Sequence, residues 1–296
     1  MSSRTPALIM EEVVRSFAGK PVLRGVSGRV EAGKVVGLLG RNGEGKSTLL
    51  SILLDMVEPD SGRVEVLGAV PDGTGQIRQS VGFVPERPCF HDFMSVSEVL
   101  SFRGRFFHRW DPSRAAALAA RLGLDLSTRI AGASKGTLGK LAWVCAAAHD
   151  PELYLLDEPT SGLDALVRDE VLSALIGELS EAGRTVLVAN HHMEEMAGLL
   201  DEIWVLSGGR IAARHDAEVL RREACLLTGR LRPGASLPAG LEAVRLASDS
   251  PLVELAVFAQ TEAERIAQSR CLEGLERAPL SLESSMKHLL RKEVAA

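Results

Sequence analysis

The nine residues GRNGEGKST, at positions 40–48, decide how the rest of the sequence is interpreted. They fit the pattern G-x-x-x-x-G-K-[ST], with Gly40, Gly45, Lys46 and Ser47 at the fixed positions. In such a phosphate-binding loop, backbone amides and the lysine ammonium surround the phosphates of a nucleoside triphosphate. The pattern predicts that a triphosphate binds. Kinases, GTPases, helicases and transport motors all carry it, so the rest of the chain must show what the energy drives.

The residues on either side of the loop supply the structure that it requires. The apolar run VVGLL, residues 35–39, predicts a buried strand that leads into the loop, and residues 47–54 predict a helix that follows it. A strand, a glycine-rich loop and a helix in this order form the phosphate-binding unit. A chance match to the fixed positions is about a one-in-a-hundred event for a chain of this length.

Composition limits the class of protein. The chain has 296 residues, of which 46% are apolar and 25% charged, so it can bury the core of one large α/β domain and a smaller unit, or the cores of two modest domains. Its formal net charge is −5 and it has no long Lys/Arg block, which argues against nucleic acid as a main partner. No C-x-x-C pattern occurs, so we expect free cytosolic thiols at Cys89, Cys145, Cys225 and Cys271.

The sequence also bears on membrane insertion and secretion. Glu11 and Glu12 interrupt the N-terminal region too early for the apolar part of a signal peptide. No apolar run approaches the roughly 18 residues of a spanning helix. We therefore expect neither a signal peptide nor a transmembrane segment.

Two further apolar runs predict central strands of a mainly parallel sheet. LYLL, residues 153–156, precedes Asp157, and TVLVA, residues 185–189, precedes Asn190 and His191. Each run follows a helical pattern, and this alternation of helices and strands is typical of parallel α/β sheets.

Between and beyond these strands, the pattern predicts two other regions. Residues 87–150 predict a helical insert, with a capping box at Ser95–Glu98 and a helix start at Asp111–Pro112. From about residue 218 the pattern changes to a small α+β unit. In that unit we expect a strand at 252–260 and amphipathic helices at 261–276 and 281–293.

Carboxylates follow the first of the two central strands. Asp157 is the expected partner of Ser47 in holding Mg²⁺, which prefers oxygen ligands. Glu158 comes next and can orient or deprotonate a water molecule that attacks the terminal phosphate. His191, after the following strand, is either a hydrogen-bond partner of that phosphate or an ordinary capping or core residue.

Together these segments resemble the ATP-binding cassette (ABC) ATPase family, and in particular the ATPase subunits of bacterial ABC-2-type exporters. The resemblance is ordered along residues 13–211. It comprises Phe17 as the adenine-stacking aromatic, GRNGEGKST as Walker A, VGFVPE (81–86) as the Q-loop, ASKGTLGKL (133–141) as the signature, LYLLDEP (153–159) as Walker B, SGLD (161–164) as the D-loop and VANHHMEE (188–195) as the switch.

The resemblance implies a fold and a set of site residues. The fold is a P-loop NTPase core at residues 1–217, with a mainly parallel sheet, an N-terminal antiparallel β part and the helical subdomain inserted at about 87–150; residues 218–296 form the accessory domain. The cofactors are ATP and Mg²⁺. The catalytic residues would be Lys46, Glu158 and His191, and the metal would be held by Ser47, Glu86 and Asp157. ATP would contact Phe17, Gly40, Asn42, Gly43, Gly45, Lys46, Ser47, Thr48 and Glu86 of one chain and Ser134 and Gly136 of a second chain.

The resemblance also implies partners. ATP would close a dimer of two such chains, more readily a homodimer than a heterodimer, and this motion would drive a separately encoded transmembrane permease. The chain would then sit at the cytoplasmic face of the cell membrane as a peripheral subunit. Within the segment 86–94, we expect Phe90 or Phe93 to be exposed and the segment to line a groove for a helix of the permease.

The sequence departs from the family pattern at four places. Glu86 replaces the Q-loop glutamine, residues 133–137 replace L-S-G-G-Q, and Ala165 stands where proline often follows the D-loop. Glu44 replaces a small residue, and we expect its carboxylate to face solvent because repulsion from a triphosphate would be costly. Two alternatives therefore stay open: a soluble ABC ATPase that acts on ribosomes, DNA or protein assemblies, and a regulatory protein with a degenerate signature.

Overall fold

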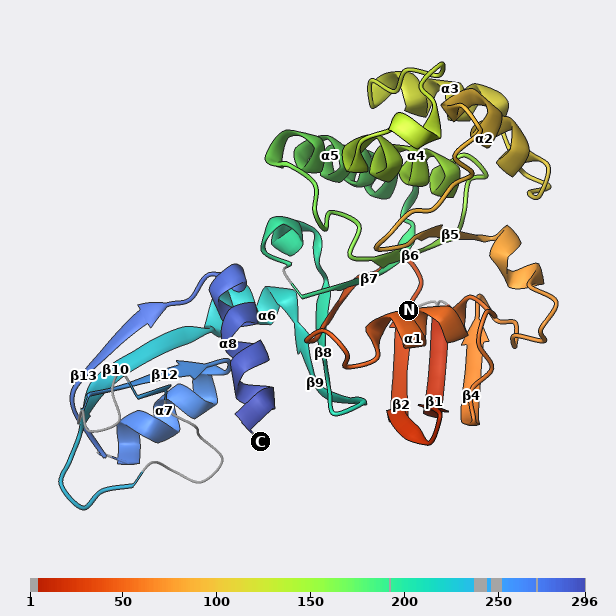
Figure 1. The fold of residues 1–296 in the computed structure, drawn as a ribbon. Helices are drawn as coiled ribbons and strands as arrows, with labels where there is room; N and C mark the ends of the chain where they lie inside the picture. Colours follow the sequence, from red (N-terminus) through yellow and green to blue (C-terminus); the bar gives the residue numbers. More distant parts are fainter. Residues whose placement is uncertain (1–4, 192, 237–243, 246–251, 270, 296) are drawn as a thin grey trace.

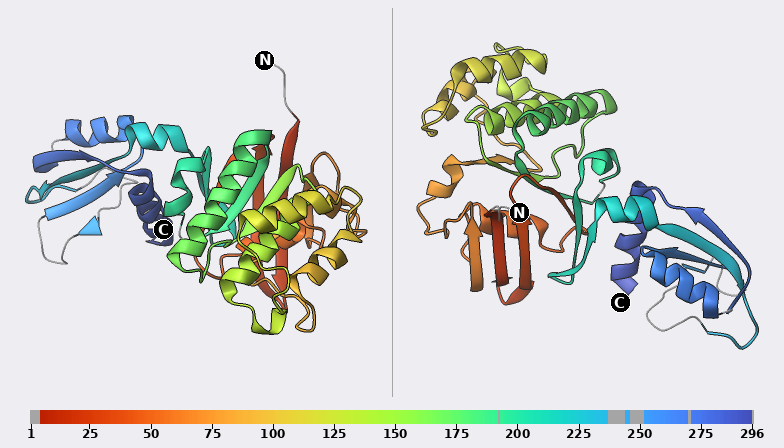
Figure 2. Two further views of the ribbon diagram at one scale, coloured as in Figure 1. Left: turned by 90° about the horizontal axis from the view of Figure 1, so that it is seen from above. Right: turned by 180° about the vertical axis from the view of Figure 1, so that it is seen from behind.

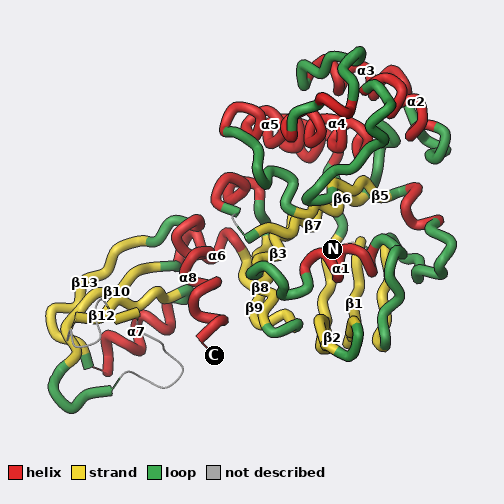
Figure 3. Tube along the Cα trace, viewed as in Figure 1, coloured by secondary structure: helices red, strands yellow, loops and turns green. Residues whose placement is uncertain are grey.

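The computed structural model describes residues 5–191, 193–236, 244–245, 252–269 and 271–295 (Figure 1). Residue 192 of the expected switch segment and residue 270 of the expected helix 261–276 therefore lie outside the described residues. The described strands form a six-stranded, a three-stranded and a four-stranded sheet. In Figure 3 the four-stranded sheet lies apart from the other two.

The six-stranded sheet carries the phosphate-binding loop. Its order is β5 (Val81–Val84), β6 (Leu153–Asp157), β7 (Thr185–Asn190), β3 (Val35–Leu39), β8 (Glu202–Ser207) and β9 (Arg210–Asp216). Every neighbouring pair is parallel except β8 and β9. The strands β3, β6 and β7 are wholly buried, which explains why they appear in the sequence as continuous apolar runs.

Alternate residues of these strands enter two different cores. On β6, Leu153 and Leu155 join helix α1 (Lys46–Leu53) and the N-terminal sheet in one core. Tyr154 and Leu156 join helices α4 (Lys135–Ala147) and α5 (Ala165–Ala182) in the other. Both faces of the sheet are therefore covered, in agreement with the α/β fold that the sequence predicts.

The three-stranded sheet is antiparallel and follows the order β2 (Lys20–Glu31), β1 (Pro6–Phe17) and β4 (Ser61–Val66). It packs against α1 through residues such as Leu8, Met10 and Leu23. The expected P-loop core with an N-terminal antiparallel part is thus confirmed.

The helical region between β5 and β6 contains α2 (Val96–Gly104), α3 (Pro112–Arg121) and α4, with short 3-10 helices η1 (Gln76–Gln79) and η2 (Ile130–Gly132) before and within it. Figure 2 shows α2, α3 and α4 gathered on one side of the molecule with α5. Ser95 and Glu98 form the complete capping box at the start of α2. The Asp111 side chain accepts hydrogen bonds from the backbone amides of Ser113 and Arg114 at the start of α3.

The four-stranded sheet follows helix α6 (Ala217–Glu223) and has the order β11 (Val244–Arg245), β12 (Leu252–Val257), β10 (Cys225–Leu231) and β13 (Leu272–Pro279). Helix α7 (Gln260–Ser269) packs on it, and α8 (Leu282–Ala295) closes the chain.

The sequence expectation of one helix at 261–276 is wrong. The helix α7 ends at Ser269, and the chain from Leu272 is strand β13, paired with β10. Gly274 interrupts the helical pattern in a left-handed conformation at φ 61°, and glycine is unfavourable within a helix. The expected strand at 252–260 is also shorter, because β12 ends at Val257 and Gln260 opens α7.

The last helix leaves the four-stranded sheet and returns to the core of the molecule. Leu282, Met286 and Leu289 of α8 share the larger core with Met193 and Leu200, which flank the 3-10 helix η3 (Glu194–Leu199). The C-terminal unit is thus packed directly beside the segment that follows His191.

None of the helices in the described part of the chain is both long and apolar enough to span a membrane. The four cysteines carry free thiols, with Cys89 exposed and Cys145, Cys225 and Cys271 buried.

Candidate functional site

The phosphate-binding loop joins β3 to α1 and is shaped by left-handed glycines. Gly43 has φ 87° and Gly45, the N-cap of α1, has φ 102°. A Cβ atom on Gly43 would meet no other atom within 4 Å, so this glycine is required by the backbone conformation. A Cβ atom on Gly45 would lie 2.7 Å from Leu23, so there the packing against β2 also requires glycine.

The lysine of the loop is buried and held by the loop itself. Lys46 Nζ donates to the carbonyl oxygens of Gly40, at 2.8 Å, and Arg41, at 3.2 Å. Ser47 and Asn42 are exposed, and Thr48 is half-buried. The loop and the start of α1 therefore offer backbone amides and an ammonium group to an anion.

Phe17, the expected adenine-stacking residue, lies at the end of β1 and is 43% exposed. The guanidinium of Arg15 lies 4.8 Å from the centre of its ring and also binds Asp60. The next strand, β2, contacts the loop at Gly45 through Val22 and Leu23. Phe17 is thus an exposed ring on the three-stranded sheet. The neighbouring strand of that sheet, β2, supports the phosphate-binding loop.

Asp157 ends β6 and is buried next to the loop. The Ser47 side chain lies close to its carboxylate. Burial raises the pKa of Asp157; the nearby Ser47 side chain opposes this, and the charges of Glu158 and Glu86 add to it. Among the described residues, the Oδ1 atom of Asp157 is buried without a hydrogen-bond partner.

These oxygens fit a hydrated Mg²⁺ ion. The unpaired Oδ1 of Asp157 can accept a hydrogen bond from a metal-bound water, and the Ser47 hydroxyl can contact the metal. In the described part of the chain, no group of three His, Cys, Asp or Glu side chains could hold a metal by itself. The phosphate oxygens of the nucleotide would have to complete the coordination. Glu86 is exposed and pairs with Arg87, with 3.5 Å between Oε1 and Nε.

Glu158 lies where three candidate residues meet. It is buried, and its Oε1 atom is 2.7 Å from Nδ1 of His191 and 3.6 Å from Nζ of Lys46. Its backbone amide donates to the carbonyl of Ala189 on β7, at 2.8 Å. The structure therefore brings together residues that the sequence placed after three separate strands, because parallel strands end at the same edge of the sheet.

Ser134 and Gly136 lie at the start of α4, in the helical layer. Ser134 is the N-cap, and its hydroxyl accepts a hydrogen bond from the amide of Thr137 at 3.0 Å. A Cβ atom on Gly136 would lie 3.1 Å from Val167, so glycine lets α4 approach α5 closely. Ser134 and Lys135 are exposed, which makes this helix start accessible to another molecule.

Glu44, which was expected to face solvent, is partly exposed and makes a hydrogen bond at the surface. Its half-buried carboxylate accepts a hydrogen bond from the amide of Gly208, at 2.6 Å. Gly208 lies in the turn between β8 and β9 with φ 56°, and this turn directs its amide toward the phosphate-binding loop. The carboxylate thus ties the loop to a neighbouring hairpin.

Sequence reasoning also missed two arginines beside the switch segment. Arg168 on α5 donates from Nη2 to the carbonyl of Leu163, at 3.1 Å, and pairs with Glu195 in η3. Arg221 on α6 donates to the carbonyls of Ala197 and Leu200. Neither arginine belongs to a motif, and only the folded chain brings them to these partners.

Comparisons with known proteins identify relatives of this chain. The family model described as ABC transporter matches residues 23–161. The Nod factor export ATP-binding protein I of Rhizobium meliloti is 36% identical over 220 residues, which cover 72% of this chain and 65% of that protein. The corresponding protein of Rhizobium leguminosarum bv. viciae is 34% identical over 223 residues, 73% of this chain and 71% of that protein. The linearmycin resistance ATP-binding protein LnrL of Bacillus subtilis is 32% identical and covers 69% and 67%. The chain therefore spans about two thirds of the length of these curated relatives.

Solved structures show the same fold. A structure described as the ATP binding subunit of an ABC transporter has a TM-score of 0.67 and 28% identity, and covers 74% of this chain and 92% of that chain. The structure of cbiO1 from Clostridium perfringens, part of the transporter complex cbiONQ, has a TM-score of 0.62 and 26% identity and covers 72% and 89%.

Proposed function

Because this chain belongs to the family of ABC transporter ATP-binding proteins, we propose that it binds and hydrolyses ATP to energise a separate membrane-spanning subunit, as an exporter ATPase. The observation that carries the proposal is the meeting of Lys46, Glu158 and His191 at the sheet edge, next to Asp157. Export is the direction suggested by the Nod factor relatives.

The residues of the site divide the work of hydrolysis. Lys46 and the amides of the loop bind the phosphates, and Phe17 stacks on the base. Ser47, Asp157 and Glu86 would hold Mg²⁺, which would supply charge neutralisation at the phosphates. Glu158 orients the attacking water and accepts its proton, while the hydrogen bond from His191 fixes the carboxylate.

A second chain completes the site. The exposed start of α4 presents the Ser134 hydroxyl and the nearby backbone amides outward, and such a helix N-terminus suits a phosphate. In the proposed dimer, Ser134 and Gly136 of one chain contact the γ-phosphate bound by the other. ATP then holds two chains together, and hydrolysis releases them.

The membrane partner docks beside α2. A pocket of about 360 Å³ lies there between the helical layer and the core, lined by Met56, Arg78, Phe106, Phe107 and His149 among others. The segment 86–94, which the sequence predicts to line a docking groove, lies outside this pocket. Its first residues line a separate pocket of about 540 Å³ with Lys135 and the 161–163 loop, so a groove at this segment stays a prediction. A docked permease would place the chain at the cytoplasmic face of the membrane.

The exposed aromatics beside this pocket support an apolar partner. Phe106, which lines the pocket, is 56% exposed and contacts Phe102 edge to face at 5.0 Å between ring centres. Phe93 is 70% exposed and stacks on His91, whereas Phe90 is half-buried against the core. An apolar surface of this kind, beside Arg78 and Arg103, suits an amphipathic helix with an acidic side chain.

The decisive experiment replaces Glu158 with glutamine. Glu158→Gln keeps the size of the side chain but removes the base, so ATP binding should persist and hydrolysis should fall about 10²-fold or more. ATP-bound dimers should accumulate, since the closed state is no longer released. Binding is measured with a fluorescent ATP analogue and turnover by phosphate release.

Two further variants separate a loss of hydrolysis from a loss of ATP binding and from a general effect on the protein. Lys46→Ala should weaken ATP binding itself, because the ammonium neutralises phosphate charge directly. Glu152→Gln changes an exposed carboxylate just before β6 and should leave both binding and turnover unchanged. Turnover near the wild-type rate in Glu158→Gln would contradict the proposed role of this carboxylate.

A further inference from the structure

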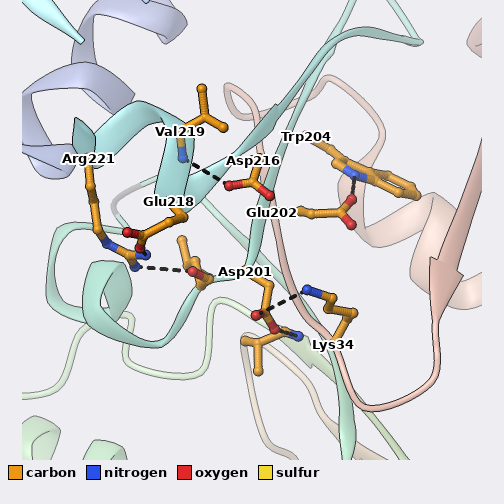
Figure 4. Close-up of polar contacts among 10 residues, drawn as sticks. Lys34, Asp201, Glu202, Trp204, Asp216, Glu218, Val219 and Arg221 are labelled. Carbon is orange, nitrogen blue, oxygen red and sulfur yellow. Dashed lines mark hydrogen bonds and ion pairs between the residues drawn. The ribbon is translucent and has the colours of Figure 1, made fainter. Parts of the chain in front are cut away.

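Arg221 connects the C-terminal unit, residues 218–296, to the segment that follows His191. Arg221 extends from α6 (Figure 4). Its Nη2 atom donates to the carbonyl of Ala197, at 2.7 Å, and to that of Leu200, at 3.1 Å. These carbonyls lie at the end of η3, where a helix lacks internal partners for its last acceptors. The guanidinium therefore supplies hydrogen bonds that the backbone of η3 cannot make by itself.

The start of η3 is held from the other side. Glu195 pairs with Arg168 on α5, and Arg168 also donates to the carbonyl of Leu163 in the expected D-loop. Met193 precedes η3 and packs against β3: a Cβ atom on Gly37 would lie 2.6 Å from its sulfur. The segment after His191 is thus fixed at each end by an arginine from a different element.

Asp201 connects the same point to the strand that feeds the phosphate-binding loop. Its carboxylate accepts hydrogen bonds from the Val35 amide, at 2.8 Å, and from Lys34 Nζ, at 3.4 Å. Its carbonyl accepts one from the amide of Ala217, the first residue of α6. The end of η3, the start of β3 and the start of α6 are therefore tied together at a single residue.

We propose that Arg221 is a positioning residue for ATP hydrolysis, which holds η3 so that His191 stays hydrogen-bonded to Glu158. This inference rests on the proposed function, in which Glu158 activates water. Arg221 does not touch the nucleotide; it acts through η3 and His191. The helix α6 leads directly into β10 of the C-terminal four-stranded sheet, and α8 packs beside η3. The C-terminal unit therefore contributes to the position of His191.

The experiment compares ATP hydrolysis by full-length variants. Arg221→Ala should lower kcat about tenfold and change the KM for ATP by less than about twofold, since binding uses the phosphate loop. The control is Arg222→Ala, the neighbouring residue on α6, which pairs with Glu223 at the surface and should leave both constants unchanged. Arg221→Lys retains a cationic donor and should recover part of the loss.

A double-variant cycle separates positioning from general stabilisation. If Arg221 acts through His191, then Arg221→Ala should cause no further loss of kcat in a His191→Ala background. Single-turnover phosphate release gives the sensitivity that this background requires. Should Arg221→Ala fold poorly by thermal unfolding, Arg221→Met keeps much of the packing and removes the donors.

The outcomes are distinct. A normal kcat in a folded Arg221→Ala protein, or a loss of kcat that persists in full in the His191→Ala background, would overturn the positioning role. The proposed function would fail separately, by normal turnover in Glu158→Gln. A shared loss in Arg221→Ala and His191→Ala, without additivity, supports the inference.

Discussion

Glu158 shows how a single residue departs from regular backbone geometry at the site. It follows the last residue of β6 and adopts φ 46°, a left-handed conformation that is uncommon for residues other than glycine. Its amide reaches Ala189 on the neighbouring strand, and its carboxylate reaches His191. Such strain costs of the order of 1–3 kcal/mol and often marks functional positions. Here it directs the carboxylate to the edge where the phosphates would lie.

His149 is a buried histidine whose titration should be visible in stability. Its ring stacks on Phe107, with ring centres 4.0 Å apart, and its Nε2 atom lies 3.2 Å from the carbonyl oxygen of Val81. Burial lowers its pKa from 6.5 to about 4. Below pH 6.5 the unfolded chain therefore binds a proton that the folded chain does not. The free energy of unfolding should fall as the pH drops from 6.5 toward 4, by at most about 3 kcal/mol from this residue.

Urea unfolding at several pH values between 7.5 and 4.5 measures this effect. His149→Gln removes the titrating group, so the variant should lose less stability than the parent as the pH falls. The control is His108→Gln, an exposed histidine, which should keep the pH dependence of the parent. An unchanged pH dependence in His149→Gln would show that another group is responsible.

At the scale of elements, the sequence was most informative where local pattern and burial agree. The strands β3, β6 and β7 were expected because strands covered on both faces are continuously apolar. The starts of α2 and α3 were expected because Ser95 and Asp111 make local caps. The strand β13 was missed, since Leu272–Pro279 is mostly exposed and acquires its structure by pairing with β10, a contact that no local pattern encodes.

The exposed aromatics around α2 yield a prediction about docking. The structure shows Phe93 and Phe106 exposed, whereas Phe90 is half-buried and would destabilise the core if truncated. Phe93→Ala combined with Phe106→Ala should leave the ATPase activity of the isolated chain within about threefold, because neither ring contacts the nucleotide site. The same protein should no longer co-purify with its membrane subunit from detergent-solubilised membranes.

Another exposed apolar residue provides the comparison. Leu275 on β13 is 37% exposed but belongs to the C-terminal sheet, so Leu275→Ala should still co-purify. Normal co-purification by the double phenylalanine variant would exclude this surface as the docking site. Loss in both variants would indicate a general effect on the protein.

At the scale of the whole molecule, the sequence identified the parts of the site better than their connections. Lys46, Asp157, Glu158 and His191 could be found because each follows an apolar strand, and parallel strands end at one edge. The hydrogen bond from Gly208 to Glu44 could not be found, since it joins residues far apart in the chain. The same holds for the bonds of Arg221, which depend on how α6 packs beside η3.

The proposed dimer gives the last prediction, which concerns sites shared between two chains. One protein carries Lys46→Ala and loses the phosphate loop; the other carries Ser134→Arg and loses the helix start that reaches across. Each alone should be nearly inactive. In a mixed dimer, one site carries both changes and the other carries neither. Equal mixing should therefore restore about a quarter of the parental ATPase activity if sites act independently, since half of the dimers are mixed.

Two controls decide what a negative result means. Ser134 is also the N-cap of α4, so Ser134→Ala, which removes the cap without adding bulk, reports how much activity is lost through the helix alone. Different affinity tags on the two chains show whether mixed dimers form. If mixed dimers form and no activity returns, two explanations remain: the site belongs to a single chain, or hydrolysis requires both sites to be intact. Single-turnover hydrolysis by the mixed dimer distinguishes them, because a shared and intact site still cleaves one ATP.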